Sequence, residues 1–276
     1  MFAGINGKAN VINQIFIGVN NRAKLIYSGS GAAGFELPSF TGSHTIFGDK
    51  NAGRIELYES GTLTLAPGTY DFFAVGGGGS GGAATNSDAT NITPGGGGGC
   101  TNTKSGYSVP RKYACQIQIG AGGTNGSGGG TIAKTPDGKI IISANPGISQ
   151  QIASSKNYGG DGGSGGSDGS NGRFGTNYGK YTGVGTGQGT TTRMFAEATN
   201  TLFAGGGGGS AGGRSYSNGA GGAGGGGASG MNRNGTAGTP NTGGGGGGFY
   251  DGNTSSTIRP GAGGSGIIVI RWNNVA

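Results

Sequence analysis

The sequence predicts a mainly β protein with almost no α-helix, in which rods of glycine extend from a sheet. Glycine makes up 74 of the 276 residues and is unevenly distributed, since residues 1–75 hold 11 glycines and the rest of the chain holds 63. A second observation is that short apolar stretches of strand length, such as Ile140–Ile142 and Ile267–Ile270, stand between or after the glycine tracts. Together these observations predict strands with glycine rods between them.

The glycine tracts read as copies of one structural device. A lone glycine run loses much conformational entropy on folding and would be a flexible linker. Runs that lie side by side can instead form left-handed helices of three residues per turn, here called polyglycine II, whose N–H and C=O groups bond to neighbouring runs. A run of nine to twelve residues would then span roughly 28–37 Å. The alternative is low-complexity disorder, because glycine and proline make up about 30% of the chain. The tracts are residues 76–82, 95–99, 120–130, 159–169, 205–213, 219–230, 243–248 and 261–266.

Residues 1–28 contain a short duplication, in which Gly4–Ile12 recurs as Gly18–Ile26 with an offset of fourteen. The Asn-Gly and Asn-Asn pairs inside the two copies suit tight hairpin turns. We expect a short β-meander that would be marginal alone and therefore docks on another surface; the alternative is an N-terminal strand pair of the main domain. Residues 29–34 have the composition of a linker, and we expect 35–276 to form one further unit.

The main unit begins with ordinary strand-like sequence. Strands are expected at residues 35–40, 44–47, 53–58, 61–65 and 69–75. Ile267–Ile270 is apolar on both faces, as is Ile140–Ile142, so both are predicted to be buried strands. Residues 194–203 are the one candidate for a helical turn or two. The expected connections between rods are residues 83–94, 101–110, 170–204, 214–218, 231–242 and 249–260.

Charge and chemistry argue against most enzyme classes and against nucleic-acid binding. The net charge is +7, which favours anionic surfaces, but the basic residues are scattered and no stacking platform is visible. The eleven acids are also scattered, and His44 has no nucleophile pattern around it. Cys100 and Cys115 could close a loop, although a reducing compartment favours free thiols. No signal peptide or membrane-length apolar run is visible.

Two sets of residues resemble known families. Gly4–Ala9 and Gly18–Ala23 resemble the N-terminal element of many bacteriophage tail and virion proteins. The strand pair around Ala66–Thr69 that leads into glycine, with Gly261–Trp272 as a closing strand, resembles the glycine-rich domains of phage tail-tip adhesins. Across roughly residues 60–272 the chain is also similar, more distantly, to the glycine-rich ectodomain of anaplastic lymphoma kinase receptors. The resemblance implies a β-sandwich from which a bundle of polyglycine II helices projects, with variable receptor-binding loops at its tips. It also implies that Ala114–Gly123 and Lys139–Ala144 are internal strands.

These observations predict a phage virion protein of the tail tip or baseplate, made in the host cytoplasm and present in multiple copies or as a homo-oligomer. Residues 1–28 would dock to other virion proteins, and the tip loops would bind a polysaccharide or protein receptor on the host surface. We expect no enzymatic activity, cofactor, metal or nucleic-acid partner. The alternative is a purely structural decoration, cement or tail protein that braces its neighbours. A hydrolase would require clustered acids.

Recognition surfaces favour tyrosine and arginine, which supply a large contact area with a polar end. The alternative for these aromatic residues is that they cap the rod ends and exclude water from the glycine bundle. The candidate tip-loop residues are Arg173, Phe174, Tyr178, Lys180, Tyr181, Tyr216, Phe249 and Tyr250.

Overall fold

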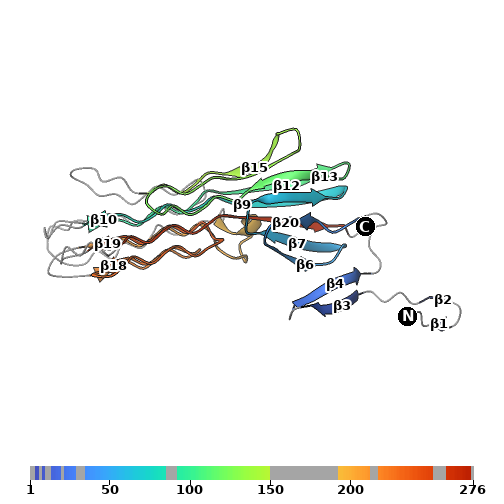
Figure 1. Ribbon diagram of the computed structural model, residues 1–276, viewed down its shortest axis with the longest axis horizontal. Coiled ribbons are helices and arrows are strands. Elements are labelled where there is room, and N and C mark those ends of the chain that lie inside the picture. The colour runs from blue at the N-terminus through green and yellow to red at the C-terminus, as the bar shows by residue number, and fades with distance from the viewer. Residues whose placement is uncertain are drawn as a thin grey trace.

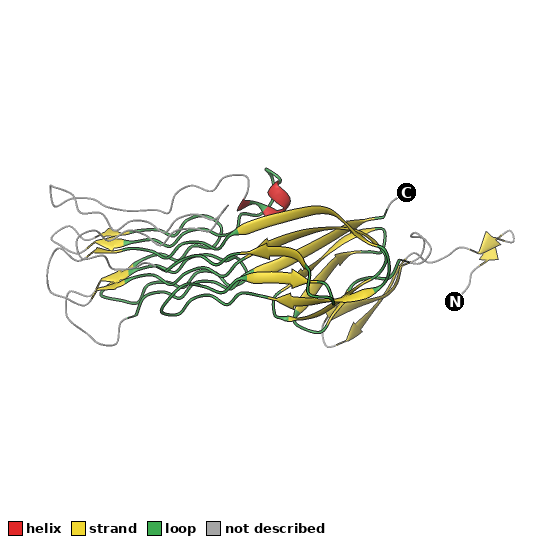
Figure 2. Ribbon diagram, turned by 90° about the horizontal axis from the view of Figure 1, so that it is seen from above, coloured by secondary structure: helices red, strands yellow, loops and turns green. Residues whose placement is uncertain are grey.

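Two five-stranded antiparallel sheets pack into a β-sandwich at one end of an elongated molecule, and glycine rods extend from it toward the other end (Figures 1 and 2). The computed structural model describes residues 4–5, 8–9, 14–19, 22–28, 35–84, 92–149, 192–211, 217–250 and 259–274. The first sheet has the order β12–β9–β20–β7–β6 and the second β15–β14–β13–β8–β5. Their bounds are β5 Ser39–Phe40, β6 His44–Gly48, β7 Ala52–Leu57, β8 Gly61–Leu65, β9 Gly68–Val75, β12 Thr101–Val109, β13 Tyr113–Gln118, β14 Thr131–Lys134, β15 Ile140–Ala144 and β20 Ile267–Asn273.

The sandwich core forms because every second side chain along a strand points inward, toward the facing sheet. Ile55 and Leu57 alternate with exposed or half-buried residues along β7, and Leu63 and Leu65 do the same along β8. The Tyr70 side chain is also inside, and its hydroxyl donates to the Ala66 carbonyl oxygen at 2.9 Å, which satisfies the buried oxygen. Burial of this apolar surface is the main stabilising contribution to the sandwich.

The outer face of the first sheet is buried too, which explains why β20 is apolar on both faces. Ile268 and Ile270 join the core between the sheets, whereas Ile267 and Val269 pack in a second cluster on the outer face. Residues 192–204, here called the strap, cover that face. The prediction that Ile267–Ile270 is a central buried strand is confirmed, because β20 lies between β7 and β9.

Other strand predictions need correction. Ile140 is 53% exposed on the edge strand β15, whereas Ile141, Ile142 and Ala144 are buried. Residues 101–110 were expected to be a connection, but β12 occupies them and pairs with β9. The strand β14 was not expected at all. In the strap, the helical turn is a single turn of 3-10 helix, η2 (Met194–Ala196), and the described residues contain no α-helix.

The rods show the hydrogen-bond period of polyglycine II. Along the first rod, the amides of Gly76, Gly79 and Gly82 donate to the carbonyls of Cys100, Gly97 and Pro94. Gly77 and Ser80 donate to a second neighbour, at Gly129 and Gly126, while Gly78 and Gly81 donate to a third, at Gly264 and Gly261. Each neighbour is thus contacted by every third residue, as a helix with three residues per turn requires. The predicted bundle of polyglycine II helices is confirmed.

One rod, residues 243–249, lies at the centre of the bundle. Its amides donate to Gly79, Gly82, Gly205, Gly208 and Thr236, and its carbonyls accept from Gly96, Gly99, Gly227, Gly230, Gly261 and Gly264. These partners belong to six different segments, namely residues 76–82, 94–100, 205–209, 225–230, 235–239 and 259–266. Six neighbours around one rod define a hexagonal packing, which only glycine permits because a Cβ on any side would meet backbone.

The rods are shorter and more numerous than the glycine tracts predicted. Residues 120–130 were expected to be one rod but fold back through a bend at 124–126, so that the Gly129 amide bonds to the Ala121 carbonyl at 2.8 Å. Residues 219–230 likewise turn at 223–225, where Gly224 and Gly225 have φ of 91° and 97°. Residues 145–149 and 235–239 contribute to the bundle despite few glycines. The tract at 159–169 lies outside the described residues.

The N-terminal residues form two separate hairpins rather than one meander. The strands β1 (Gly4–Ile5) and β2 (Lys8–Ala9) pair with each other, as do β3 (Gln14–Val19) and β4 (Arg22–Ser28). Ile5 pairs with Lys8 and Val19 with Arg22, and the Asn-containing pairs between them, residues 6–7 and 20–21, lie outside the described residues. Cys100 and Cys115 are both buried, and they do not form a disulfide.

Candidate functional site

The far end of the rod bundle gathers six short strands into two small sheets. In the first, β10 (Ala83–Ala84), β19 (Phe249–Tyr250) and β18 (Gly230–Met231) run parallel, because the rods that precede them all leave the sandwich in the same direction (Figure 1). The second contains β11 (Ile92–Thr93), β16 (Ser210–Ala211) and β17 (Ser217–Asn218). Residues 85–91, 212–216 and 251–258 follow these strands in the chain, so three connections start from one small region.

The structure places two of the eight predicted tip residues. Phe249 and Tyr250 form β19, in the middle of the parallel sheet at the far end. The Phe249 side chain is only 1% exposed, so it packs at the rod end and is not available to a receptor. This agrees with the alternative that aromatic residues close the end of the glycine bundle. The others, Arg173, Phe174, Tyr178, Lys180, Tyr181 and Tyr216, lie outside the described residues.

Two exposed arginines at the same end were not among the predicted site residues. Arg233 lies shortly after β18. The Arg259 amide donates to the Asn234 Oδ1 at 2.8 Å. The Arg259 carbonyl accepts from the Gly235 amide at 3.0 Å. These backbone contacts bring the two arginines to neighbouring positions. The described part of the rod bundle carries no acidic residue, since the described acids, Glu36, Asp49, Glu56, Glu59, Asp71, Asp137 and Glu197, belong to the sandwich and the strap. Isolated arginines in a sequence give no signal of such proximity.

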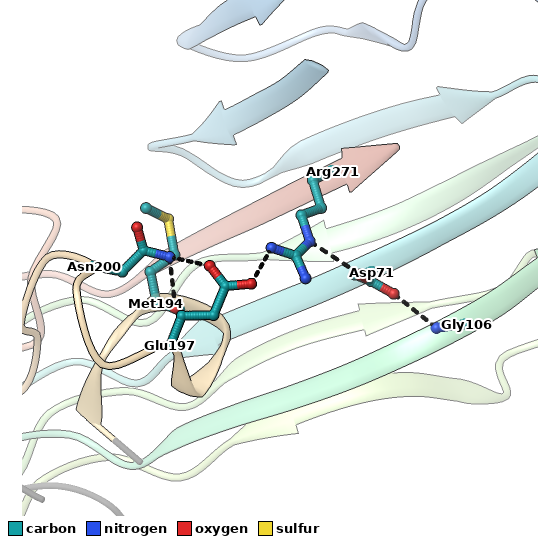
Figure 3. A network of polar contacts seen from close by, with 6 residues as sticks. All are labelled: Asp71, Gly106, Met194, Glu197, Asn200 and Arg271. Atoms are coloured by element: carbon teal, nitrogen blue, oxygen red, sulfur yellow. Dashed lines mark hydrogen bonds and ion pairs between the residues drawn. The ribbon is translucent and has the colours of Figure 1, made fainter. Parts of the chain in front are cut away.

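The strap is held against the sandwich by a polar network at the base of the rods (Figure 3). The Arg271 guanidinium donates to Asp71 at 2.9 Å and to Glu197 at 2.6 Å, and it lies 4.1 Å from the centre of the Phe195 ring. Asn200 donates to the other Glu197 oxygen at 2.6 Å. Burial lowers the pKa of Arg271, but its hydrogen bonds to Glu197 and Asp71 outweigh burial and raise the pKa overall.

Strain in the strap indicates that this network and the apolar cluster hold it firmly. Phe195 and Ala196 both adopt positive φ, 55° and 58°, which side chains other than glycine rarely accept. Such residues cost about 1–3 kcal/mol each and persist where the surroundings fix them. The Phe195 ring packs on Phe73, with ring centroids 5.9 Å apart. The strap therefore fixes the chain directly after the undescribed residues 150–191, which contain most of the predicted tip residues.

Burial perturbs several titratable groups among the described residues. Burial raises the pKa of the Cys115 thiol to about 12 and also raises that of Cys100, which leaves both as neutral thiols at ordinary pH. Burial is likewise the largest cause of the raised pKa of Tyr113, whose hydroxyl donates to that of Tyr107 at 2.8 Å. The sole histidine, His44, makes a 2.8 Å contact from Nδ1 to the Gly42 carbonyl and packs edge-on against Phe40.

Among the described residues, no group of three or more His, Cys, Asp or Glu side chains is placed to hold a metal ion. In the same part of the chain, no helix is long and apolar enough to cross a membrane.

Comparison with known proteins identifies the domain. The profile of a glycine-rich domain family matches residues 58–273, from the end of β7 through the last strand of the sandwich. No curated protein matches the sequence significantly. The matched region contains the whole rod bundle and most of the strands that surround it. The chain therefore belongs to the glycine-rich domain family.

Proposed function

We propose that this protein is a bacteriophage virion protein of the tail tip or baseplate, which binds a receptor on the host surface through the connections at the far end of its rod bundle. The observation that carries the proposal is that three connections start from one small region of a cross-bonded scaffold. Binding residues commonly lie on loops that a rigid scaffold positions. The resemblance of the N-terminal duplication and of the closing strand to phage proteins supports the virion assignment.

A rigid bundle is a suitable support for receptor-binding connections, because it limits the conformational entropy that is lost when the receptor binds. Every rod residue between Gly76 and Gly82 donates its amide to another segment, so this rod cannot move independently of its neighbours. A preorganised surface binds more tightly because less freedom is lost on binding. Copies on one particle would multiply weak contacts into firm attachment. The exposed Arg233 and Arg259 favour a receptor with anionic groups, such as a charged surface polysaccharide.

We propose binding without catalysis. Of the described carboxylates, Glu56 pairs with Arg54 at 2.9 Å, while Asp71 and Glu197 both bond Arg271. These acids hold strands and strap together, because each of the three is paired with an arginine. We place the protein in the virion and its synthesis in the host cytoplasm.

A bracing role in the particle is the second candidate, and one surface favours it. The strand β6 is the outer strand of its sheet and exposes Ile46 and Phe47, which are 36% and 40% accessible. An exposed edge strand with apolar side chains is a place where a strand of another protein can pair with the sheet. In that role the chain would hold its neighbours together through the sandwich, and the rods would serve as a rigid spacer.

Adsorption competition tests the two candidates. Purified protein is added to host cells before the phage, and unadsorbed phage are counted. Saturable inhibition supports receptor binding, and a Tyr178→Ala/Tyr181→Ala variant should then inhibit less at unchanged melting temperature. Ile140→Ala, an exposed residue of the sandwich, is the matched control and should inhibit like wild type. Folded protein that never inhibits would refute receptor binding and leave the bracing role.

A further inference from the structure

The duplication near the N-terminus is a structural repeat as well as a sequence repeat. In the first hairpin Gly4 pairs with Ala9 and Ile5 with Lys8. In the second, the residues fourteen positions later pair in the same way, Gly18 with Ala23 and Val19 with Arg22. The two hairpins therefore present the same residue types at the same register positions beside their turns. Two hairpins with the same register can place equivalent residues against equivalent sites on a partner.

Neither hairpin has a partner sheet within the described residues. The strands β1 and β2 form a two-stranded sheet, β3 and β4 form another, and neither joins a five-stranded sheet of the sandwich. Isolated two-stranded hairpins are marginal in water at best and need packing against another surface. The hairpins must therefore gain their stability from a surface that the described part of the chain does not supply.

The charge of this segment defines the chemistry of that surface. The first 35 residues contain three basic residues, Lys8, Arg22 and Lys24, and the first acidic residue of the chain is Glu36. Lys8 and Arg22 occupy the equivalent position directly after each turn. A basic surface is attracted to an acidic one and repelled by another basic one, which selects the partner.

We propose that the two hairpins are a paired docking element that binds two equivalent acidic sites on a neighbouring protein, with Lys8 and Arg22 as the corresponding contacts. This inference rests on the proposed place of the protein in a virion. The chain between the hairpins also limits the partner. Ala9 and Gln14 are five residues apart, so their separation is at most about 18 Å. The two acidic sites must therefore be adjacent, as on neighbouring subunits around a symmetry axis or on tandem repeats.

Two linked contacts have a testable property that one contact lacks. Once the first hairpin is bound, the short connection holds the second at a high effective concentration near its site. Loss of one contact should therefore weaken docking, and loss of both should weaken it far more than either alone. A single dominant contact would instead make one substitution equal to the double substitution.

The test uses phage that carry full-length variants, with copies of the protein per purified particle measured by quantitative mass spectrometry. Lys8→Glu and Arg22→Glu should each lower the copy number several-fold, and the double variant should be nearly absent from particles. Lys24→Glu is the matched control, because it makes the same charge change at a position whose counterpart in the first repeat is Asn10, and it should retain most copies. Unchanged melting of the purified variants shows that the sandwich has folded.

The outcomes separate the inference from the function on which it rests. Wild-type protein in particles together with a double variant that is incorporated normally would overturn the docking element and leave the virion assignment standing. A single variant as severe as the double, with its partner variant harmless, would overturn the paired contact. Absence of wild-type protein from particles would overturn the virion assignment and the docking role with it.

Discussion

Replacing one glycine at the centre of the bundle should destabilise the whole domain. In Gly246→Ala, the new Cβ would lie 2.0 Å from the Gly261 carbonyl oxygen and 2.5 Å from its carbon. Both atoms are backbone, so the two rods must separate by more than an ångström to reach ordinary contact. The Gly246 amide and carbonyl also bond to Gly79 and Gly96, each at 2.9 Å, and these bonds would lengthen when the rod moves.

The expected cost follows from these contacts. Overpacking a tight interior costs about 1–3 kcal/mol and each hydrogen bond contributes about 1 kcal/mol, so Gly246→Ala should lose about 3–5 kcal/mol. For a chain of this size that is a fall of about 10 °C in melting temperature. Thermal and urea unfolding followed by circular dichroism would measure both quantities.

A matched control exists in the same bundle. A Cβ at Gly126 would meet nothing within 4 Å, and the residue does not have positive φ. Gly126→Ala should therefore leave stability unchanged or raise it by about 0.5 kcal/mol, because alanine restricts the unfolded chain. If Gly246→Ala melted together with wild type and Gly126→Ala, the reasoning about rod spacing would be wrong.

Three further predictions concern the sandwich, the strap and the far end. Cys115 should resist thiol reagents at pH 8 until the protein unfolds. Because burial raises its pKa from an ordinary 9.0 to about 12, its contribution to stability is complete below pH 9 and is lost as the pH rises toward 12. Urea titrations across that pH range would show this loss. Glu197→Gln should cost less than about 1 kcal/mol, since its ion pair with Arg271 is half-exposed, and a loss above 2 kcal/mol in urea titration would contradict this. Phe249→Ala should lower stability by about 3–5 kcal/mol, because the ring is buried; an unchanged melting curve would contradict the view that this ring closes the rod end.

Sequence reasoning predicted the existence of the rods but not their extent. The predicted rods were tracts in which only small residues interrupt glycine, whereas a rod at the surface of the bundle needs glycine only where it faces other rods. In residues 145–149, Gly147 is buried, while Asn145 and Ile148, three residues apart, are exposed. Ala220 and Ala223 show the same spacing beside buried or half-buried glycines. The sequence pattern that indicates a surface rod is therefore a residue other than glycine at every third position. The same spacing occurs at Asp161, Ser164 and Ser167, which lie outside the described residues.

Strands of the sandwich were predictable where apolar and polar residues alternate clearly. They were not predictable where a segment is a strand only because it pairs with a neighbouring strand. The pattern in β7 and β8 is clear from sequence, whereas β12 reads Thr-Asn-Thr-Lys-Ser-Gly-Tyr-Ser-Val and is mostly polar. The segment forms a strand because it pairs with the edge of β9, over seven residue pairs. At the far end, nothing local places Arg259 beside Asn234, since contacts between residues distant in the chain depend on how the rods stack.

The position of β20 has a consequence for how the protein is made. This strand, residues 267–273, lies between β7 and β9, and the rod that leads into it is one of the six around the centre of the bundle. A nascent chain that has reached only residue 260 thus has an open slot in the middle of its first sheet, with two strand edges unpaired. Such edges invite pairing with other chains, and contacts between residues so distant in sequence form slowly. We expect the first sheet to close only after residues 267–273 have emerged from the ribosome, so that translation speed and chaperone capacity up to that point influence the yield of native protein.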